Sequence, residues 1–364
     1  MKKFTKLITL ILTAAVTAGI AFAQPKLVSA TAKTEYAIDW YLNGGVQNES
    51  NTATYTAEDG LVLSKPTREG YEFTGWFDNA RFTGLPITEI KKGDTQKKYF
   101  WAGWKFTTDG AKTWVDSEMV NIIPQGMKAP MENFAGVGGT TIINAYDIGK
   151  HEVTQNVYAS VMGYNPSNFY NNPADGETQD LRPVENVSWY DAIVFCNRLS
   201  VIMGKTPCYS VNGTTDTVKW GYKPHDGDRI NYTVVCDMSA NGYRLPTSGE
   251  WEMAARGGTV GGWDFNYSGS DNQYDVGWTS YTSNDRTHQV GIKKANALGL
   301  YDMTGNVYEW CNDAYDSNDS SDQFIQRGGC FESYNDSCAV TYRSRDYRQR
   351  RSEGIGFRIV CSCQ

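Results

Sequence analysis

The N-terminal third of the chain alternates aromatic and polar residues with a period of two. Residues 36–41 and 54–62 have the apolar and polar alternation of half-buried strands, and Asn43-Gly44-Gly45 between them is typical of a tight turn. The same alternation returns at 71–77 and again at 99–104, where tryptophans replace smaller apolar residues. The pattern therefore predicts a small β module over residues 35–105, followed by a short linker at 106–114.

From about residue 115 the pattern changes to one of helical segments separated by long polar loops. A strand is expected at 144–149. Three helices follow, each with its own start or stop signal: 155–162 after a Thr154 N-cap, 190–203 after Ser188, and 250–256 before Gly257-Gly258. On the second helix, Ala192, Phe195, Cys196 and Leu199 share one apolar face. Short helices among much irregular chain favour an α+β fold.

The last quarter of the chain has an unusual arrangement. Three segments rich in glycine and aromatic residues, at 299–310, 327–329 and 354–360, enclose a stretch at 330–351 that is dense in Tyr, Asn, Asp, Ser and Arg. The enclosing segments have the composition of a scaffold. Tyr and Arg supply contact area and Ser and Asn supply adaptable hydrogen bonds, so the stretch between has the composition of a binding surface.

The first 23 residues have the features of a secretory signal peptide. Lys2, Lys3 and Lys6 precede an apolar run at 7–22, and Ala21-Phe22-Ala23 forms a cleavage site before Gln24. We expect residues 24–34 to be a flexible leader. Since no later apolar run reaches 18 residues, we expect no transmembrane span. The protein is then exported, to the cell surface or the outer envelope and periplasm.

The net charge and the numbers of Arg, His and Cys residues limit the classes of function that we expect. The formal charge is −7, and loss of the three signal-peptide lysines lowers it to about −10, so a nucleic-acid partner is not expected. Five arginines between 343 and 351 form the one basic cluster, and most are expected to neutralise nearby acids. The three histidines share no metal-ligand spacing. Eight cysteines lie in the C-terminal two-thirds, and their pairing is open among free thiols and one or two disulfides.

One sequence motif points to the identity of the β module. The segment PTREGYEFTGWF at 66–77, closed by YFWAGW at 99–104, resembles the Listeria–Bacteroides surface repeat, also called the internalin B-repeat. The resemblance implies a small β-grasp-like module of the kind that bacterial surface proteins use as a spacer.

The rest of the chain resembles a second family in consistent order from residue 115 to 361. The segments GKHEVTQNVY (149–158), RPVENVSWYDAIVFCNRLS (182–200), YRLPTSGEWEMAARGG (243–258), ANALGLYDMTGNVYEW (295–310), RGG and GFRIV are similar to the formylglycine-generating enzyme or sulfatase-modifying-factor family. This resemblance implies a C-type-lectin-like fold.

The enzyme activity of that family does not transfer directly to this chain. Members that oxidise a cysteine use two copper-binding cysteines five residues apart after the RGG segment, and here Ser333 occupies the first position and Cys338 the second. Because a copper–thiolate pair needs both sulfurs, we expect no catalytic residues. An oxidoreductase with an atypical active site is the alternative.

The resemblance also implies a candidate calcium site, although no cofactor is required for binding. Calcium in the family is held at positions that match Asp302, Gly305, Val307 and Glu309, which together offer two carboxylates and two carbonyls. The alternative is that both carboxylates accept hydrogen bonds from a tight loop.

Another branch of the family consists of variable proteins of diversity-generating retroelements, of the TvpA type, in which the segment between RGG and GFR contacts the ligand. That resemblance implies a monomer, displayed at the cell surface, that binds a protein or glycan. A purely structural envelope protein is a further alternative. The expected ligand-binding residues are Asp313, Tyr315, Phe331, Ser333, Tyr334, Asn335, Ser337, Tyr342, Ser344, Asp346 and Tyr347.

Overall fold

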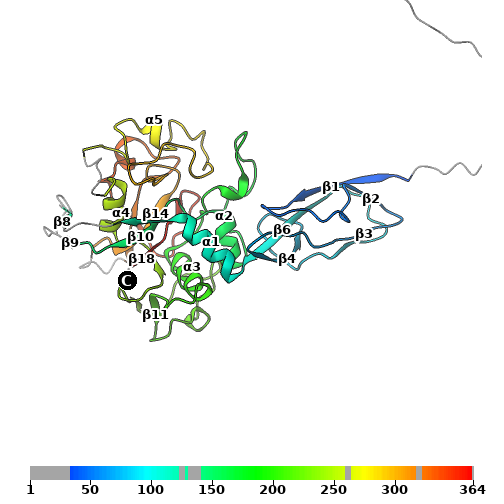
Figure 1. Ribbon diagram of the computed structural model, residues 1–364, viewed down its shortest axis with the longest axis horizontal. Helices are drawn as coiled ribbons and strands as arrows, with labels where there is room; N and C mark the ends of the chain where they lie inside the picture. Colours follow the sequence, from blue (N-terminus) through cyan, green and yellow to red (C-terminus); the bar gives the residue numbers. More distant parts are fainter. Residues whose placement is uncertain (1–32, 123–127, 130–140, 259–263, 317–321, 363–364) are drawn as a thin grey trace, which may run out of the picture. The chain divides into compact units, whose positions relative to one another are not determined.

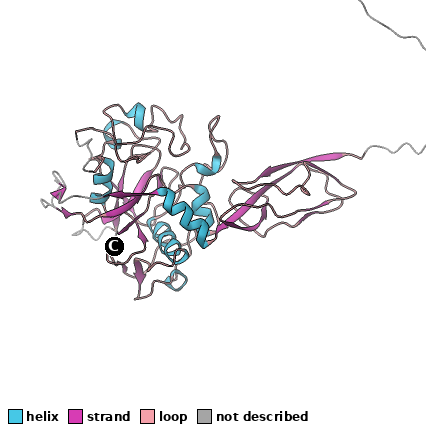
Figure 2. Ribbon diagram, in the orientation of Figure 1, coloured by secondary structure: helices cyan, strands magenta, loops and turns pink. Residues whose placement is uncertain are grey.

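A computed structural model describes residues 33–122, 128–129, 141–258, 264–316 and 322–362. The predicted signal peptide and nearly all of the predicted leader lie outside the described residues. The chain from Glu35 onward forms one compact unit of mixed helices and strands, coloured in Figure 2. No helix in the described part of the chain is both long and apolar enough to cross a bilayer.

The β module is a mixed four-stranded sheet. Its strand order is β2 (Thr54–Thr56), β1 (Glu35–Tyr41), β6 (Lys98–Phe106) and β4 (Tyr71–Phe77), with β1 and β6 parallel and the outer pairs antiparallel. A two-stranded ribbon of β3 (Leu61–Val62) and β5 (Glu89–Ile90) packs beside it. The strand expected at 54–62 is thus two short strands, because the chain turns at Gly60 with φ +65°.

The core of this module is aromatic. Trp76, Phe100 and Trp104 are buried with Ile38 and Tyr55, in the alternating positions that the sequence predicted. The Trp104 indole donates to the Leu42 carbonyl across the Asn43–Gly44 turn, where φ is positive at both residues.

The residues expected as a linker are structured instead. β6 continues to Phe106, and helix α1 (Thr108–Glu118) begins at once behind a Thr107 N-cap. Ala111 and Val115 of this helix are buried in the core of the larger domain. The sequence analysis missed α1 because its helical pattern is weak: three of its first five residues are polar and one is a glycine. Burial against other elements stabilises the helix.

The three predicted helices are present with small shifts at their ends. They are α2 (Gln155–Met162), α3 (Trp189–Ile202) and α4 (Ser248–Ala255). Ser188 and Thr247 each form a complete capping box, with Asp191 and Glu250 respectively. The expected strand at 144–149 is β10 (Tyr146–Gly149).

Two four-stranded sheets support the larger domain. The first is antiparallel, in the order β13 (Tyr243–Arg244), β18 (Val360–Ser362), β10 and β7 (Met119–Ile122). The second sheet holds the C-terminal segments, in the order β16 (Ser344–Tyr347), β15 (Gln323–Arg327), β14 (Tyr308–Ala314) and β17 (Ile355–Gly356). Figure 1 shows α1, α2 and α3 close together, on the side of the domain from which β6 arrives.

The remaining elements are short and belong to loops: β8 (Lys128–Ala129), β9 (Thr141–Ile142), β11 (Tyr209–Val211), β12 (Val234–Cys236), α5 (Gln273–Val276) and the 3-10 turns Gln179–Leu181, Thr217–Trp220 and Asn335–Cys338. The predicted α+β class is confirmed. Among the cysteines, Cys196, Cys208, Cys236, Cys311, Cys330 and Cys338 are unbridged thiols.

Candidate functional site

A buried ion pair lies in the part of the domain that carries residues 330–351, whose exposed surface we call the C-terminal face. Strand β14 (Tyr308–Ala314) places Glu309 opposite Arg358, with Nε–Oε2 and Nη2–Oε1 distances of 2.7 and 2.8 Å, and neither side chain is exposed to solvent. The Trp251 indole of α4 also donates to Glu309 Oε2 at 2.7 Å. The pair therefore links α4, β14 and the GFRIV segment (354–360).

Two further acids lie in the same buried region. Glu152 accepts from the Asn306 amide at 2.7 Å and from the Val307 backbone at 3.1 Å, while Asp302 accepts from the Gly291 backbone at 2.7 Å. Burial, followed by the charges of Asp302 and Glu309, raises the pKa of Glu152 well above its usual range. Burial likewise raises the pKa of Asp302.

The calcium prediction does not fit this arrangement. Both oxygens of Glu309 are engaged by Arg358 and Trp251, so they are not available to share an ion with Asp302. No group of three or more metal-ligating side chains occurs in the described ranges. Asp302 accepts from a backbone amide, as the alternative expects, whereas Glu309 pairs with the Arg358 and Trp251 side chains and not with a tight loop.

The positions that match the family's catalytic pair are packed inside the domain. Ser333 Oγ accepts from the Cys330 backbone at 2.9 Å and lies 3.2 Å from the Tyr308 hydroxyl and 3.5 Å from Cys330 Sγ. Burial raises the pKa of Cys338 to about 12 and also raises the pKa of Cys330. Since the thiolate is the nucleophile, these buried thiols are poorly suited to nucleophilic attack at neutral pH.

Two of the predicted ligand-binding residues, Phe331 and Ser333, are buried, and a third, Asp313, is half-buried and bonded to the start of α4. Phe331 is 1% exposed and packs edge-on against Phe169, with ring centroids 5.2 Å apart. Ser333 is buried as described above. Asp313 accepts from the Ser248 backbone at the start of α4, and burial raises its pKa.

Other predicted residues do face solvent. Tyr334 is 64% exposed, and Asn335 beside it opens the 3-10 turn Asn335–Cys338. Tyr342 and Tyr347 are also exposed, the latter at the end of β16 (Ser344–Tyr347), which is the edge strand of the second sheet. These positions have the exposure that a recognition surface needs.

The structure adds two tyrosines that the sequence analysis missed. Tyr281 packs edge-on against Tyr334 at 5.7 Å, and Tyr274 of α5 lies 5.9 Å from Tyr281. All three rings are largely exposed, and Gln273 donates to the Asn335 side chain at 3.1 Å. We call Tyr274, Tyr281 and Tyr334 the tyrosine cluster. The local sequence carried no signal for it, because 53 positions separate Tyr281 from Tyr334.

The other predicted contact residues are half-buried. Ser344 and Asp346 alternate along β16 opposite Gln326 and Phe324 of β15 (Gln323–Arg327), and Ser337 lies within the 3-10 turn. Tyr315 lies beneath the Arg343 and Arg345 guanidinium groups, at 5.2 and 4.4 Å from its ring centroid. These residues line the edge of the face and support it.

Three arginines of the basic cluster pair with acids, as expected. Arg351 binds Asp191 at 2.8 Å within the α3 capping box, Arg348 pairs with Asp322, and Arg350 lies 3.9 Å from Asp346.

Residues 92–363 match the family described as "Sulfatase-modifying factor enzyme 1-like domain", and residues 36–95 match the "Listeria-Bacteroides repeat domain". This chain belongs to the sulfatase-modifying factor enzyme 1-like family. A relative in Paenibacillus barcinonensis, "Chaperone protein LppX", is 34% identical over 281 residues, which cover 72% of this chain and 95% of that protein. A shorter match, 32% over 133 residues, covers 33% of this chain and 44% of "Inactive C-alpha-formylglycine-generating enzyme 2" of Bos taurus.

Solved structures agree with this assignment. "Treponema denticola variable protein 1" is 36% identical with a TM-score of 0.58, and the match covers 67% of this chain and 95% of that one. CarF is 29% identical with a TM-score of 0.54, covering 68% and 98%. The recognised families and the C-type-lectin-like fold are therefore both confirmed.

Proposed function

We propose that this protein is an exported, surface-displayed binding protein without enzyme activity, and that its C-terminal face recognises a macromolecular partner without a cofactor. The exposed tyrosine cluster is the observation that carries this proposal. Exposed tyrosines give large, rigid contact area at low conformational cost.

The chemistry of the family's catalytic positions supports binding over oxidation. Ser333 cannot supply a thiolate, and Cys338 is buried with a pKa raised by that burial to about 12. Among the relatives, one is named a variable protein and one a chaperone. The name chaperone favours a polypeptide as the partner of the C-terminal face, with a glycan as the alternative. We also propose that the exposed positions from 334 to 347 are those that a retroelement would diversify.

The test substitutes the exposed tyrosines. A Tyr334→Ala/Tyr347→Ala double variant should weaken binding at least tenfold, because central interface tyrosines each contribute about 2 kcal/mol. The unfolding free energy should fall by less than about 1 kcal/mol, since both rings are exposed. Binding is measured by surface plasmon resonance against immobilised peptide and glycan libraries.

Tyr232→Ala, an exposed tyrosine in the loop before β12, is the matched control and should change neither quantity. A large loss of stability in the double variant would show that the rings belong to the core. Copper-dependent oxidation of a cysteine-containing sulfatase peptide by the wild-type protein would instead establish the oxidoreductase alternative.

A further inference from the structure

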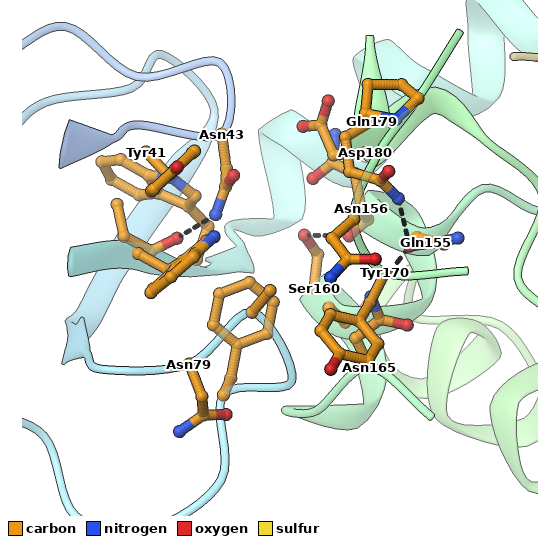
Figure 3. Close-up of a pocket in the computed structure, with 18 of the residues that line it drawn as sticks. Tyr41, Asn43, Asn79, Gln155, Asn156, Ser160, Asn165, Tyr170, Gln179 and Asp180 are labelled. Carbon is orange, nitrogen blue, oxygen red and sulfur yellow. Dashed lines mark hydrogen bonds between the residues drawn. The ribbon is translucent and has the colours of Figure 1, made fainter. Parts of the chain in front are cut away.

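A second candidate binding site lies away from the C-terminal face. A cavity of about 580 Å³ opens between the β module and the segments around α2. Figure 3 shows Tyr41, Asn43 and Asn79 on one side of the gap, facing Asn156, Ser160 and Tyr170 on the other. This volume falls within the range of roughly 300–1,000 Å³ that is typical of small-molecule sites.

Contacts on both sides hold the walls of the cavity in place. Arg68 Nη1 donates to Asn156 Oδ1 at 3.0 Å, and the Asn165 backbone donates to the Arg81 carbonyl at 3.1 Å. Gly70 and Gly110 approach so closely that a Cβ on Gly110 would lie 1.8 Å from the Gly70 carbonyl oxygen. These contacts therefore hold the two walls of the cavity at a fixed distance from each other.

One wall is a flat aromatic surface. Tyr41 of β1 and Trp101 of β6 are register partners on parallel strands, and their rings stack with centroids 4.5 Å apart and 4° between planes. Tyr41 keeps 41% of its surface exposed. Phe82 and Tyr170 add rings at the rim. Such a surface accepts a flat ligand that has one apolar face.

The opposite wall is lined with neutral amides. Gln155 receives hydrogen bonds from Asn165 at 2.9 Å and Gln179 at 3.1 Å, which fixes the floor. Asn156 uses its Oδ1 for Arg68, so its amide NH₂ is available to a ligand, and the exposed residue Asn171 also lines the cavity. An amide can donate and accept together, which matches hydroxyl groups.

The charge of the lining excludes several ligand classes. Asp78 and Asp180 are its ionisable acids, and no Lys, Arg or His occurs among the described residues that line the cavity. An anionic ligand such as a phosphate would meet these carboxylates, while the neighbouring cations Arg68 and Arg81 are engaged with Asn156 and with the Tyr170 ring.

Two residues that line the cavity have a left-handed backbone conformation. Phe82 has φ +57° and Asn172 has φ +54°, and both line the cavity. A left-handed conformation costs a residue with a Cβ about 1–2 kcal/mol, and such strain gathers at ligand sites. At Phe82 the strained backbone directs an aromatic ring towards Phe77, with centroids 5.7 Å apart, and keeps the loop against the cavity.

We propose that this junction cavity binds a short neutral oligosaccharide. The apolar face of a sugar ring would stack on Tyr41, and its hydroxyl groups would bond to Asn156, Asn171 and the two carboxylates. The β module would then contribute to recognition in addition to acting as a spacer.

The test is isothermal titration of the purified protein with maltotriose, cellotriose and chitotriose. At least one trisaccharide should bind with a micromolar to low-millimolar Kd. Tyr41→Ala should weaken that binding at least tenfold. Ala80→Trp, which fills the cavity from an exposed loop, should abolish it. The control is Tyr232→Ala: Tyr232 is also an exposed tyrosine but does not line this cavity, so affinity should stay within twofold of wild type.

Several results would overturn the proposal. The first is that none of the three sugars binds at millimolar concentration. The second is that the Tyr41→Ala and Ala80→Trp variants both bind sugar as tightly as the wild type. The third is that glucose 6-phosphate binds more tightly than neutral sugar. The Tyr334→Ala/Tyr347→Ala variant separates the two proposals. Retained trisaccharide affinity in that variant supports the junction site, whereas its loss would assign the sugar to the C-terminal face.

Discussion

Removal of the charge on Glu309 tests whether the C-terminal face depends on the buried Glu309–Arg358 ion pair. In Glu309→Gln the carboxylate becomes a neutral amide of nearly the same shape. In the wild-type protein Arg358 donates to Glu309 through Nε and Nη2. Its Nη1 donates to the Gly149 and Lys150 carbonyls, and Nη2 also donates to the Tyr301 carbonyl. The variant leaves a fully buried guanidinium opposite an NH₂ group that cannot accept a hydrogen bond.

The size of the effect follows from this geometry. Breaking a buried ion pair by removal of one partner costs about 3–5 kcal/mol, because the other charge stays buried. Glu152 and Asp302 also attract Arg358, and loss of the Glu309 charge makes ionisation of Glu152 easier. That compensation places the expected loss near the lower end, about 3 kcal/mol, which lowers the Tm by roughly 6–12 °C for a domain of this size.

The assay is urea unfolding followed by tryptophan fluorescence, with calorimetry for the Tm. Glu72→Gln is the matched control: Glu72 pairs with Lys105 at 2.9 Å on the exposed surface, where such a pair contributes less than about 1 kcal/mol. In the double variant Glu309→Gln/Arg358→Met, the loss should be at least about 1 kcal/mol smaller than the sum of the single losses.

A loss below about 1 kcal/mol in Glu309→Gln would refute this reasoning. It would mean that water or another acid already neutralises Arg358. Additive losses in the double variant would equally show that the two side chains act independently.

Two further predictions concern the interior and the junction. Burial raises the pKa of Glu185 to about 8, above the 4.5 usual for this side chain, so the folded state holds its proton more tightly and stability should fall as pH rises from about 4.5 to 8. Glu185→Gln should flatten that decline in Tm scans across this range, and an unchanged slope would assign it to other groups. Gly110→Ala should destabilise the protein by about 1–3 kcal/mol, because the methyl group meets the Gly70 carbonyl oxygen. The control Gly249→Ala, also in the first turn of a helix, makes only ordinary contact with Ile143 and should be neutral in the same unfolding assay; equal losses in both would contradict the steric argument.

The sequence by itself determined the local structure and the family. The helices α2 and α3 were predictable because Thr154 and Ser188 satisfy backbone amides within three residues of themselves. Helix α4 was predictable from the Gly257-Gly258 stop signal, although its Thr247 cap and its first two residues were not predicted. The alternating aromatic residues of the β module were predictable for the same reason of short range. The departure at Ser333 from the family's cysteine pair was also visible without a structure.

Tertiary structure decided which residues of the C-terminal segment face solvent. Phe331 and Tyr334 are three positions apart, and both are aromatic. Phe331 is buried against Phe169 from a distant loop, whereas Tyr334 is exposed beside Tyr281. Only the packed chain brings those partners together, because each contact joins segments more than 50 residues apart.

The same limit applies to the buried charges and to the junction. Glu309 carries no local sign that Arg358 will take both of its oxygens, and Tyr41 carries none that Asn156 will face it. Capping and alternation are short-range effects that a sequence displays directly. Desolvation, ion pairing and cavity shape depend on which distant segments exclude water from one another, and that is fixed only when the chain has folded.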